Sequence, residues 1–186
     1  MMPPIAGGHR NDLRHPDFPN DFRDFIRELN AQQVEYLLVG GFAVGMYGHV
    51  RATADIDFLY RRTAENIGRL MKALEQFGAP ADVIDLEHLA KPAGIIAFGE
   101  PPNRIDLLAS ISGVSFEEAR AQAVVLDIAG DRLPVIGLDA LRANKAASGR
   151  KKDLDDLKRL PLLPPRMLAA EPHGHPEPHR AERRRQ

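Results

Sequence analysis

Apolar residues recur at the spacing of an amphipathic helix in several segments of the chain. Phe22, Phe25, Ile26 and Leu29 lie on one face of residues 19–32, which predicts a helix there. A short helix is expected to begin at the glycines of "GFAVGMYGH", and a helical turn or two within residues 82–91. The same spacing predicts a helix over 64–77, which Thr63 can cap and Gly78 ends. Ser115 and Glu118 form a capping box for a helix from 116 to about 123, and two further helices are expected over 138–148 and 151–160.

Short apolar runs between these segments predict strands. "VEYLLVGG" is read as a buried strand over 34–39, and "DIDFLY" as a strand over 55–60. "GIIAFG" and "RIDLLAS" are expected to pair as a hairpin, and "AVVLDIAGDRLPVIG" to form a second hairpin that turns at Gly130-Asp131. The order of elements predicts a mixed α/β (α+β) fold, whose central β-sheet is not purely parallel and is flanked by helices.

The length and composition suit one globular domain with unpatterned ends. The chain has 186 residues and no Cys, which excludes disulfides and thiolate metal sites. Residues 1–16 are expected to form a flexible arm, 17–160 the domain, and 161–186 a disordered tail rich in Pro, His and Arg.

The net charge and the hydropathy of the chain limit the classes of partner that it is expected to bind. The formal net charge is −1, so no global basic field attracts nucleic acid. No apolar run approaches the roughly 20 residues that span a bilayer, and the N-terminus lacks the apolar stretch of a secretory signal. We therefore expect a cytoplasmic protein with no membrane partner.

Two acidic residues interrupt one of the apolar strands. Strand alternation places Asp55 and Asp57 on the same face, with Cα atoms roughly 6.5 to 7 Å apart. Two carboxylates this close suit Mg²⁺, which takes oxygen ligands and completes its shell with phosphates. If the strand that carries Asp106 lies beside them, three acids could hold two metal ions. The blander alternatives are solvated strand-end acids and an ion pair of Asp106 with Arg104.

Gly40 and Gly41 end the preceding strand and admit two interpretations. They form either an ordinary tight turn or a place where backbone N–H groups approach a phosphate. Arg51 and Thr53 come just before the acidic strand, and Arg51 could fork onto phosphate oxygens or simply lie on the surface.

The glycine pair, the "DID" strand and the later strand Asp together resemble the DNA-polymerase-β-type nucleotidyltransferase superfamily. "LLVGGFAVGMYGHVRATADIDFLY" is similar to AbiEii-like and other minimal bacterial nucleotidyltransferases, whose first motif joins a glycine turn to R-x-T-x-D-h-D. "LRANKAASGRKKDLDDLKRL" resembles their later motif, in which a helix Lys precedes R-x-K-D-x-x-D. The resemblance covers about residues 34–160 and implies the nucleotidyltransferase fold.

The resemblance also implies roles for particular residues. Metal binding and catalysis would fall to Asp55, Asp57 and Asp106, with two Mg²⁺ ions and a nucleoside triphosphate such as ATP as substrate. The nucleotide-binding residues would be Gly40, Gly41, Arg51, Thr53, Lys145, Arg150 and Asp153, where Asp153 orients Lys145 or Arg150. Asp156 and Asp155 are as readily explained as solvated helix acids, Asp156 as a partner of Arg159.

Two departures from the family's pattern concern the turn and the length. Many members have Gly-Ser where this chain has Gly40-Gly41, which removes a hydroxyl contact to phosphate. The chain is also shorter than AbiEii-type toxins, which carry a sizeable C-terminal helical domain.

The acceptor of the nucleotide remains open at this point. One hypothesis is a toxin-like enzyme of a toxin–antitoxin pair, with RNA or protein as acceptor and an antitoxin-like partner. A second is a small-molecule nucleotidyltransferase that modifies antibiotics, and a third is a nucleotide-binding module without turnover. A wide cleft beside Asp106 would favour the first, and an acidic pocket suited to aminoglycosides the second. A glycosyltransferase that holds a nucleotide sugar through DxD ranks last.

Overall fold

The computed structural model describes residues 19–53, 55–128 and 130–162. The expected N-terminal arm over residues 1–16 lies outside these ranges. Of the expected tail over 161–186, only the first two residues lie within them.

Helices and strands follow one another along the chain in the predicted order. The helices are α1 (Asn20–Ala31), α2 (Gly40–Met46), α3 (Ala64–Phe77), α4 (Leu86–Ala90), α5 (Phe116–Ala121), α6 (Leu138–Ser148) and α7 (Lys151–Arg159). The strands are β1 (Tyr36–Val39), β2 (Asp55–Tyr60), β3 (Ile95–Phe98), β4 (Arg104–Leu108), β5 (Val124–Ile128) and β6 (Asp131–Val135).

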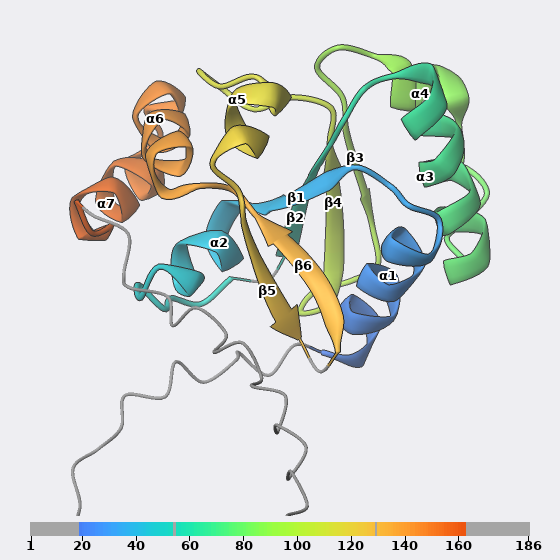
Figure 1. Ribbon diagram of the computed structural model, residues 1–186, viewed down its shortest axis with the longest axis horizontal. Coiled ribbons are helices and arrows are strands. Elements are labelled where there is room, and N and C mark those ends of the chain that lie inside the picture. Colours follow the sequence, from blue (N-terminus) through green and yellow to red (C-terminus); the bar gives the residue numbers. More distant parts are fainter. Residues whose placement is uncertain (1–18, 54, 129, 163–186) are drawn as a thin grey trace, which may run out of the picture.

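The strands form one six-stranded sheet in the order β3-β4-β2-β1-β6-β5. The pairs β2/β4 and β1/β6 are parallel, whereas β1/β2, β3/β4 and β5/β6 are antiparallel. Figure 1 shows α1, α3 and α4 gathered at one side of the sheet, and α6 and α7 at the other. The prediction of a mixed central sheet flanked by helices is confirmed.

Local capping explains where several helices begin and end. The Thr63 hydroxyl accepts a hydrogen bond from Asn66 N–H, and Gly78 ends the same helix in the left-handed conformation. Ser115 and Glu118 form the expected capping box of α5, which ends at Ala121, slightly earlier than predicted.

The strand expected from residue 34 begins later, at Tyr36. Val34 N–H donates to the Leu29 carbonyl at 2.9 Å, so Val34 closes the end of α1 instead of opening β1.

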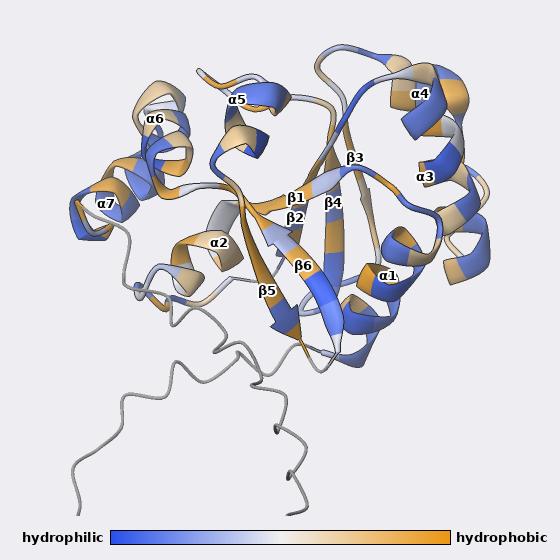
Figure 2. Ribbon diagram, in the orientation of Figure 1, coloured by the Kyte–Doolittle hydropathy of each residue, from blue (hydrophilic) through white to orange (hydrophobic). Residues whose placement is uncertain are grey.

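The core occupies the face of β2 that lies opposite Asp55 and Asp57. Ile56, Phe58 and Tyr60 are buried there. Phe25 of α1 meets the ring of Phe58 edge-on, with centroids 5.6 Å apart. Figure 2 shows apolar residues concentrated on the strands and polar residues on the outer faces of helices. Because alternate side chains point to opposite faces, packing α1 on one face directs the two acids to the other.

None of the helices in the described ranges has the length and apolar character needed to cross a membrane.

Candidate active site

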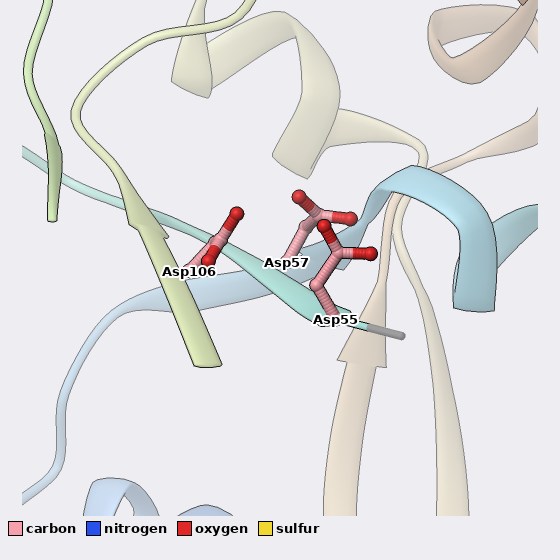
Figure 3. Close-up of side chains that lie close together, drawn as sticks. All are labelled: Asp55, Asp57 and Asp106. Atoms are coloured by element: carbon pink, nitrogen blue, oxygen red, sulfur yellow. The ribbon is translucent and has the colours of Figure 1, made fainter. Parts of the chain in front are cut away.

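Three carboxylates converge where β2 and β4 run side by side. The two strands are parallel and in register, so Asp57 lies directly beside Asp106. Ligand oxygens of Asp55, Asp57 and Asp106 all lie within 4.8 Å of one another. Figure 3 shows the three side chains projecting from these two strands to the same side of the sheet. The condition set by the sequence, that the Asp106 strand should neighbour the "DID" strand, is therefore met.

The environment of Asp57 disfavours its negative charge. Burial, and then the charges of Asp55 and Asp106, raise the pKa of Asp57 from 3.8 to about 6. Lys145 and the backbone N–H of Gly41 act in the opposite direction but do not cancel this effect. A cation placed among the three carboxylates would relieve the repulsion between them. The all-oxygen donor set matches the ligand preference of Mg²⁺.

Arg104 also lies in this cluster. Its Nε and Nη2 donate to the two oxygens of Asp106, both at 2.8 Å, and Nη2 reaches Asp55 Oδ2 at 3.0 Å. The ion pair considered as an alternative from the sequence is thus present together with the triad.

The glycine pair packs directly against the acids. Gly40 has a φ of +65°, and a Cβ there would lie 1.9 Å from Asp57 Oδ2. A Cβ on Gly41 would lie 2.9 Å from Thr53 Oγ1 and 3.2 Å from Arg51 Nη2. Glycine is therefore required at residue 40 for backbone conformation and space, whereas a Cβ at residue 41 would make the Thr53 and Arg51 side chains shift.

Thr53 lies beside the triad. Its hydroxyl is 3.1 Å from Asp55 Oδ1 and 3.2 Å from the Asp55 carbonyl oxygen. Thr53 therefore helps to fix the orientation of Asp55.

A second charged network joins α6 and α7 to the loop before β2. Lys145 Nζ contacts Asp153 Oδ1 at 2.6 Å and Asp156 Oδ2 at 3.2 Å, and all three residues are buried. Arg51 donates to both oxygens of Asp156, at 2.8 and 3.0 Å. Asp153 also accepts a hydrogen bond from Arg150 Nε at the start of α7. The network holds Lys145 and Arg51 at the edge of the carboxylate cluster.

The interpretation of Asp156 as a solvated helix acid is wrong. Asp156 is only 1% exposed and pairs with Arg51 and Lys145, not with Arg159. The spacing of α7 contained the signal, because Asp153 and Asp156 fall three residues apart on the same face as buried Leu160. Asp155, by contrast, is exposed and pairs with Lys158, as its interpretation as a surface acid required.

The two networks line one cavity of about 800 Å³. Its cationic wall contains Arg51, Lys145, Arg150 and Lys152, and a more apolar wall contains Ile95, Ala97, Leu108 and Ile111. Nine of the ten residues proposed from the sequence for catalysis or nucleotide binding line this cavity. The tenth, Asp153, lies behind Lys145 and Arg150, to which it is hydrogen-bonded.

The environment of Asp153 predicts that the protein loses part of its stability at low pH. Burial raises its pKa, but hydrogen bonds from Lys145, Ser148 and Arg150 outweigh burial and lower the pKa from 3.8 to about 2. Stability from a lowered carboxyl pKa is present above the unfolded value and is lost as pH falls toward the folded value. We expect a loss of roughly 1 to 2 kcal/mol between about pH 4 and pH 2, allowing for screening by water in the cavity.

Urea unfolding at a series of pH values measures this loss. Asp153→Asn should flatten the dependence in this window, whereas Asp155→Asn on the exposed side of α7 should retain it. Parallel curves for all three proteins would contradict the assignment.

Comparisons with known proteins bear on the fold. No protein-family model and no curated protein matches the chain. TM1012, a Thermotoga maritima protein named as a nucleotidyltransferase, superposes with a TM-score of 0.52 at 13% identity, over 82% of this chain and 97% of that chain. The antibiotic-resistance factor ANT(2'')-Ia gives 0.49 at 16% identity, over 75% of this chain and 80% of that chain. The lincosamide antibiotic adenylyltransferase LnuA gives 0.47 at 14% identity, over 77% and 96%. The chain therefore has the fold of a nucleotidyltransferase, shared with TM1012.

Proposed function

We propose that the protein is a metal-dependent nucleotidyltransferase that moves a nucleoside monophosphate from a nucleoside triphosphate to an acceptor hydroxyl. The convergence of Asp55, Asp57 and Asp106 at one cavity beside the Gly40–Gly41 turn carries this proposal. The fold, shared with a protein named as a nucleotidyltransferase, supports it.

Asp55, Asp57 and Asp106 would hold the divalent metal, for which we propose two Mg²⁺ ions. When bound, Mg²⁺ would polarise the phosphate oxygens and lower the pKa of the attacking hydroxyl. Asp57 is suited to this role because its negative charge is unfavourable in the folded protein, as its raised pKa indicates, and a bound metal ion would offset that charge. Thr53 supports the site by fixing Asp55.

The cationic wall would bind the triphosphate. The Lys145 ammonium carries three N–H donors, of which Asp153 and Asp156 occupy two, so one is left for a phosphate oxygen. Arg51 and Arg150 are likewise anchored by α7 carboxylates while they line the cavity. This anchoring reduces the conformational entropy lost when phosphate binds.

In the proposed reaction the acceptor oxygen bonds to the α-phosphorus as the bond to the β-phosphate oxygen breaks and pyrophosphate leaves. The hydroxyl proton passes to Asp106, which lines the cavity next to its apolar wall. The chain's own residues thus act by positioning the reactants and stabilising charge.

The charges of the cavity favour one class of acceptor. Among its lining residues within the described ranges, Asp55, Asp57 and Asp106 are the only acids, whereas several are Arg or Lys. A polycationic aminoglycoside would therefore find no carboxylates beyond those proposed for metal. We propose a neutral or anionic acceptor, which includes the RNA end expected of a toxin-like enzyme with an antitoxin-like partner.

Calorimetric titration of Mg²⁺-ATP and Mg²⁺-GTP into wild type and Asp57→Ala tests the proposal. We expect binding to wild type and a loss of at least about tenfold in affinity for the variant. Equal affinities would contradict the metal site. Transfer of label from α-labelled nucleotides to RNA, protein or small-molecule fractions would then identify the acceptor, and absence of pyrophosphate release with every nucleotide and fraction would favour a binding module.

A further inference from the structure

The positively charged guanidinium of Arg104 lies between Asp55 and Asp106, where it takes the place of a metal cation. Arg104 precedes Asp106 by two residues on β4, so both side chains lie on the same face of the sheet. Arg104 is also the register partner of Asp55 on the neighbouring strand β2. Its hydrogen bonds occupy both oxygens of Asp106 and one oxygen of Asp55. Arg104 therefore bridges the two strands that form the triad.

Arg104 differs from the other cations of the cavity in what it binds. Arg51, Lys145 and Arg150 are anchored to carboxylates of α7, whereas Arg104 forms ion pairs with Asp55 and Asp106 of the triad itself. The side chain of Arg104 is 39% exposed and lines the cavity, so it has room to turn away from the acids.

A divalent ion and this guanidinium compete for the same oxygens. An ion that coordinates Asp106 must bind oxygens that already accept charge-assisted hydrogen bonds, and its charge repels the nearby guanidinium. Arg104 offsets the charges of Asp106 and Asp55 through these hydrogen bonds, whereas Asp57 accepts a hydrogen bond from Gly41 N–H.

We infer that Arg104 is a positioning residue that serves as the counter-cation of the triad until a divalent ion displaces it from Asp106. The displaced guanidinium then offers its donors to a polyphosphate in the same cavity. Metal and polyphosphate consequently bind with positive coupling, and metal alone binds weakly. This inference rests on the metal site of the proposed function.

Titration of Mn²⁺ followed by electron paramagnetic resonance measures the competition directly on the full chain. Without polyphosphate, Arg104→Gln should bind Mn²⁺ about tenfold or more tightly than wild type, because the charge-assisted hydrogen bonds no longer compete. Inorganic tripolyphosphate should tighten Mn²⁺ binding more in wild type than in Arg104→Gln. Arg69→Gln, which removes the same charge from an exposed ion pair on α3, should stay within about twofold of wild type.

Arg104→Lys provides a second variant that retains the charge but loses the fork, and its Mn²⁺ affinity should lie between those of wild type and Arg104→Gln. Thermal unfolding in chelator confirms that each variant folds. Equal or weaker Mn²⁺ binding in both Arg104 variants, with binding still lost in Asp57→Asn, would overturn the role of Arg104 and leave the metal site standing. Absence of saturable Mn²⁺ binding in wild type and all variants would instead overturn the metal site.

Discussion

Replacing Asp57 by asparagine is expected to slow nucleotidyl transfer by about a thousandfold or more while the protein remains folded. The substitution removes a carboxylate from the triad, and a metal ion contributes several kcal/mol to stabilising the charge of the transition state. Pyrophosphate release under saturating Mg²⁺ and nucleotide measures the loss.

The same substitution should not lower stability. The folded state raises the pKa of Asp57 to about 6, so its negative charge is unfavourable at neutral pH. Asparagine removes that charge and retains an oxygen that can accept the hydrogen bond of Gly41 N–H. We therefore expect a free energy of unfolding, in metal-free buffer, equal to or above that of wild type.

Asp24→Asn is a suitable control, because Asp24 is an exposed acid on α1 that pairs with Arg27. This variant should keep both rate and stability. A rate of nucleotidyl transfer by Asp57→Asn within tenfold of the wild-type rate would contradict the assignment of the triad. A large fall in its free energy of unfolding would contradict the conclusion that the charge of Asp57 is unfavourable in the folded protein.

Replacing Lys145 by methionine is expected to lower the free energy of unfolding by about 3 kcal/mol or more. Lys145 and its partners Asp153 and Asp156 are each no more than 3% exposed. Removal of the ammonium leaves two buried carboxylates with less charge compensation, and breaking a buried ion pair from one side is costly. Arg51 and Arg150 retain part of that compensation, which keeps the loss at the lower end of the usual range.

Urea or thermal unfolding at neutral pH measures this loss. Lys158→Met is the matched control, because Lys158 lies on α7 and pairs at 3.3 Å with the exposed Asp155. Its effect should stay within about 0.5 kcal/mol. If Lys145→Met and Lys158→Met destabilised the protein equally, the buried network would not be a structural element.

Short-range patterns were sufficient for the elements of the fold. The spacing of Phe22, Phe25, Ile26 and Leu29 predicted α1, and the same residues are buried in the structure. The capping residues Thr63 and Ser115 predicted two helix starts. Such signals depend on residues within one or two turns of each other, so they can be read directly from the chain.

The candidate site was predicted only in part from its residues. Alternation on a strand places Asp55 and Asp57 on one face whatever the rest of the chain does. The membership of Asp106 depended on the pairing of strands far apart in sequence, for which the resemblance, not the spacing, gave the expectation.

Sequence by itself therefore determined the order and type of the elements, the face of β2 that carries the acids and the turn made by Gly40 and Gly41. Only the tertiary structure decided that Asp106 lies beside Asp57, that Asp156 is buried against Arg51 and Lys145, and that Arg104 bridges the triad. The reason is physical: periodicity and capping act within a segment, whereas strand register and the burial of charges depend on which distant segments pack together.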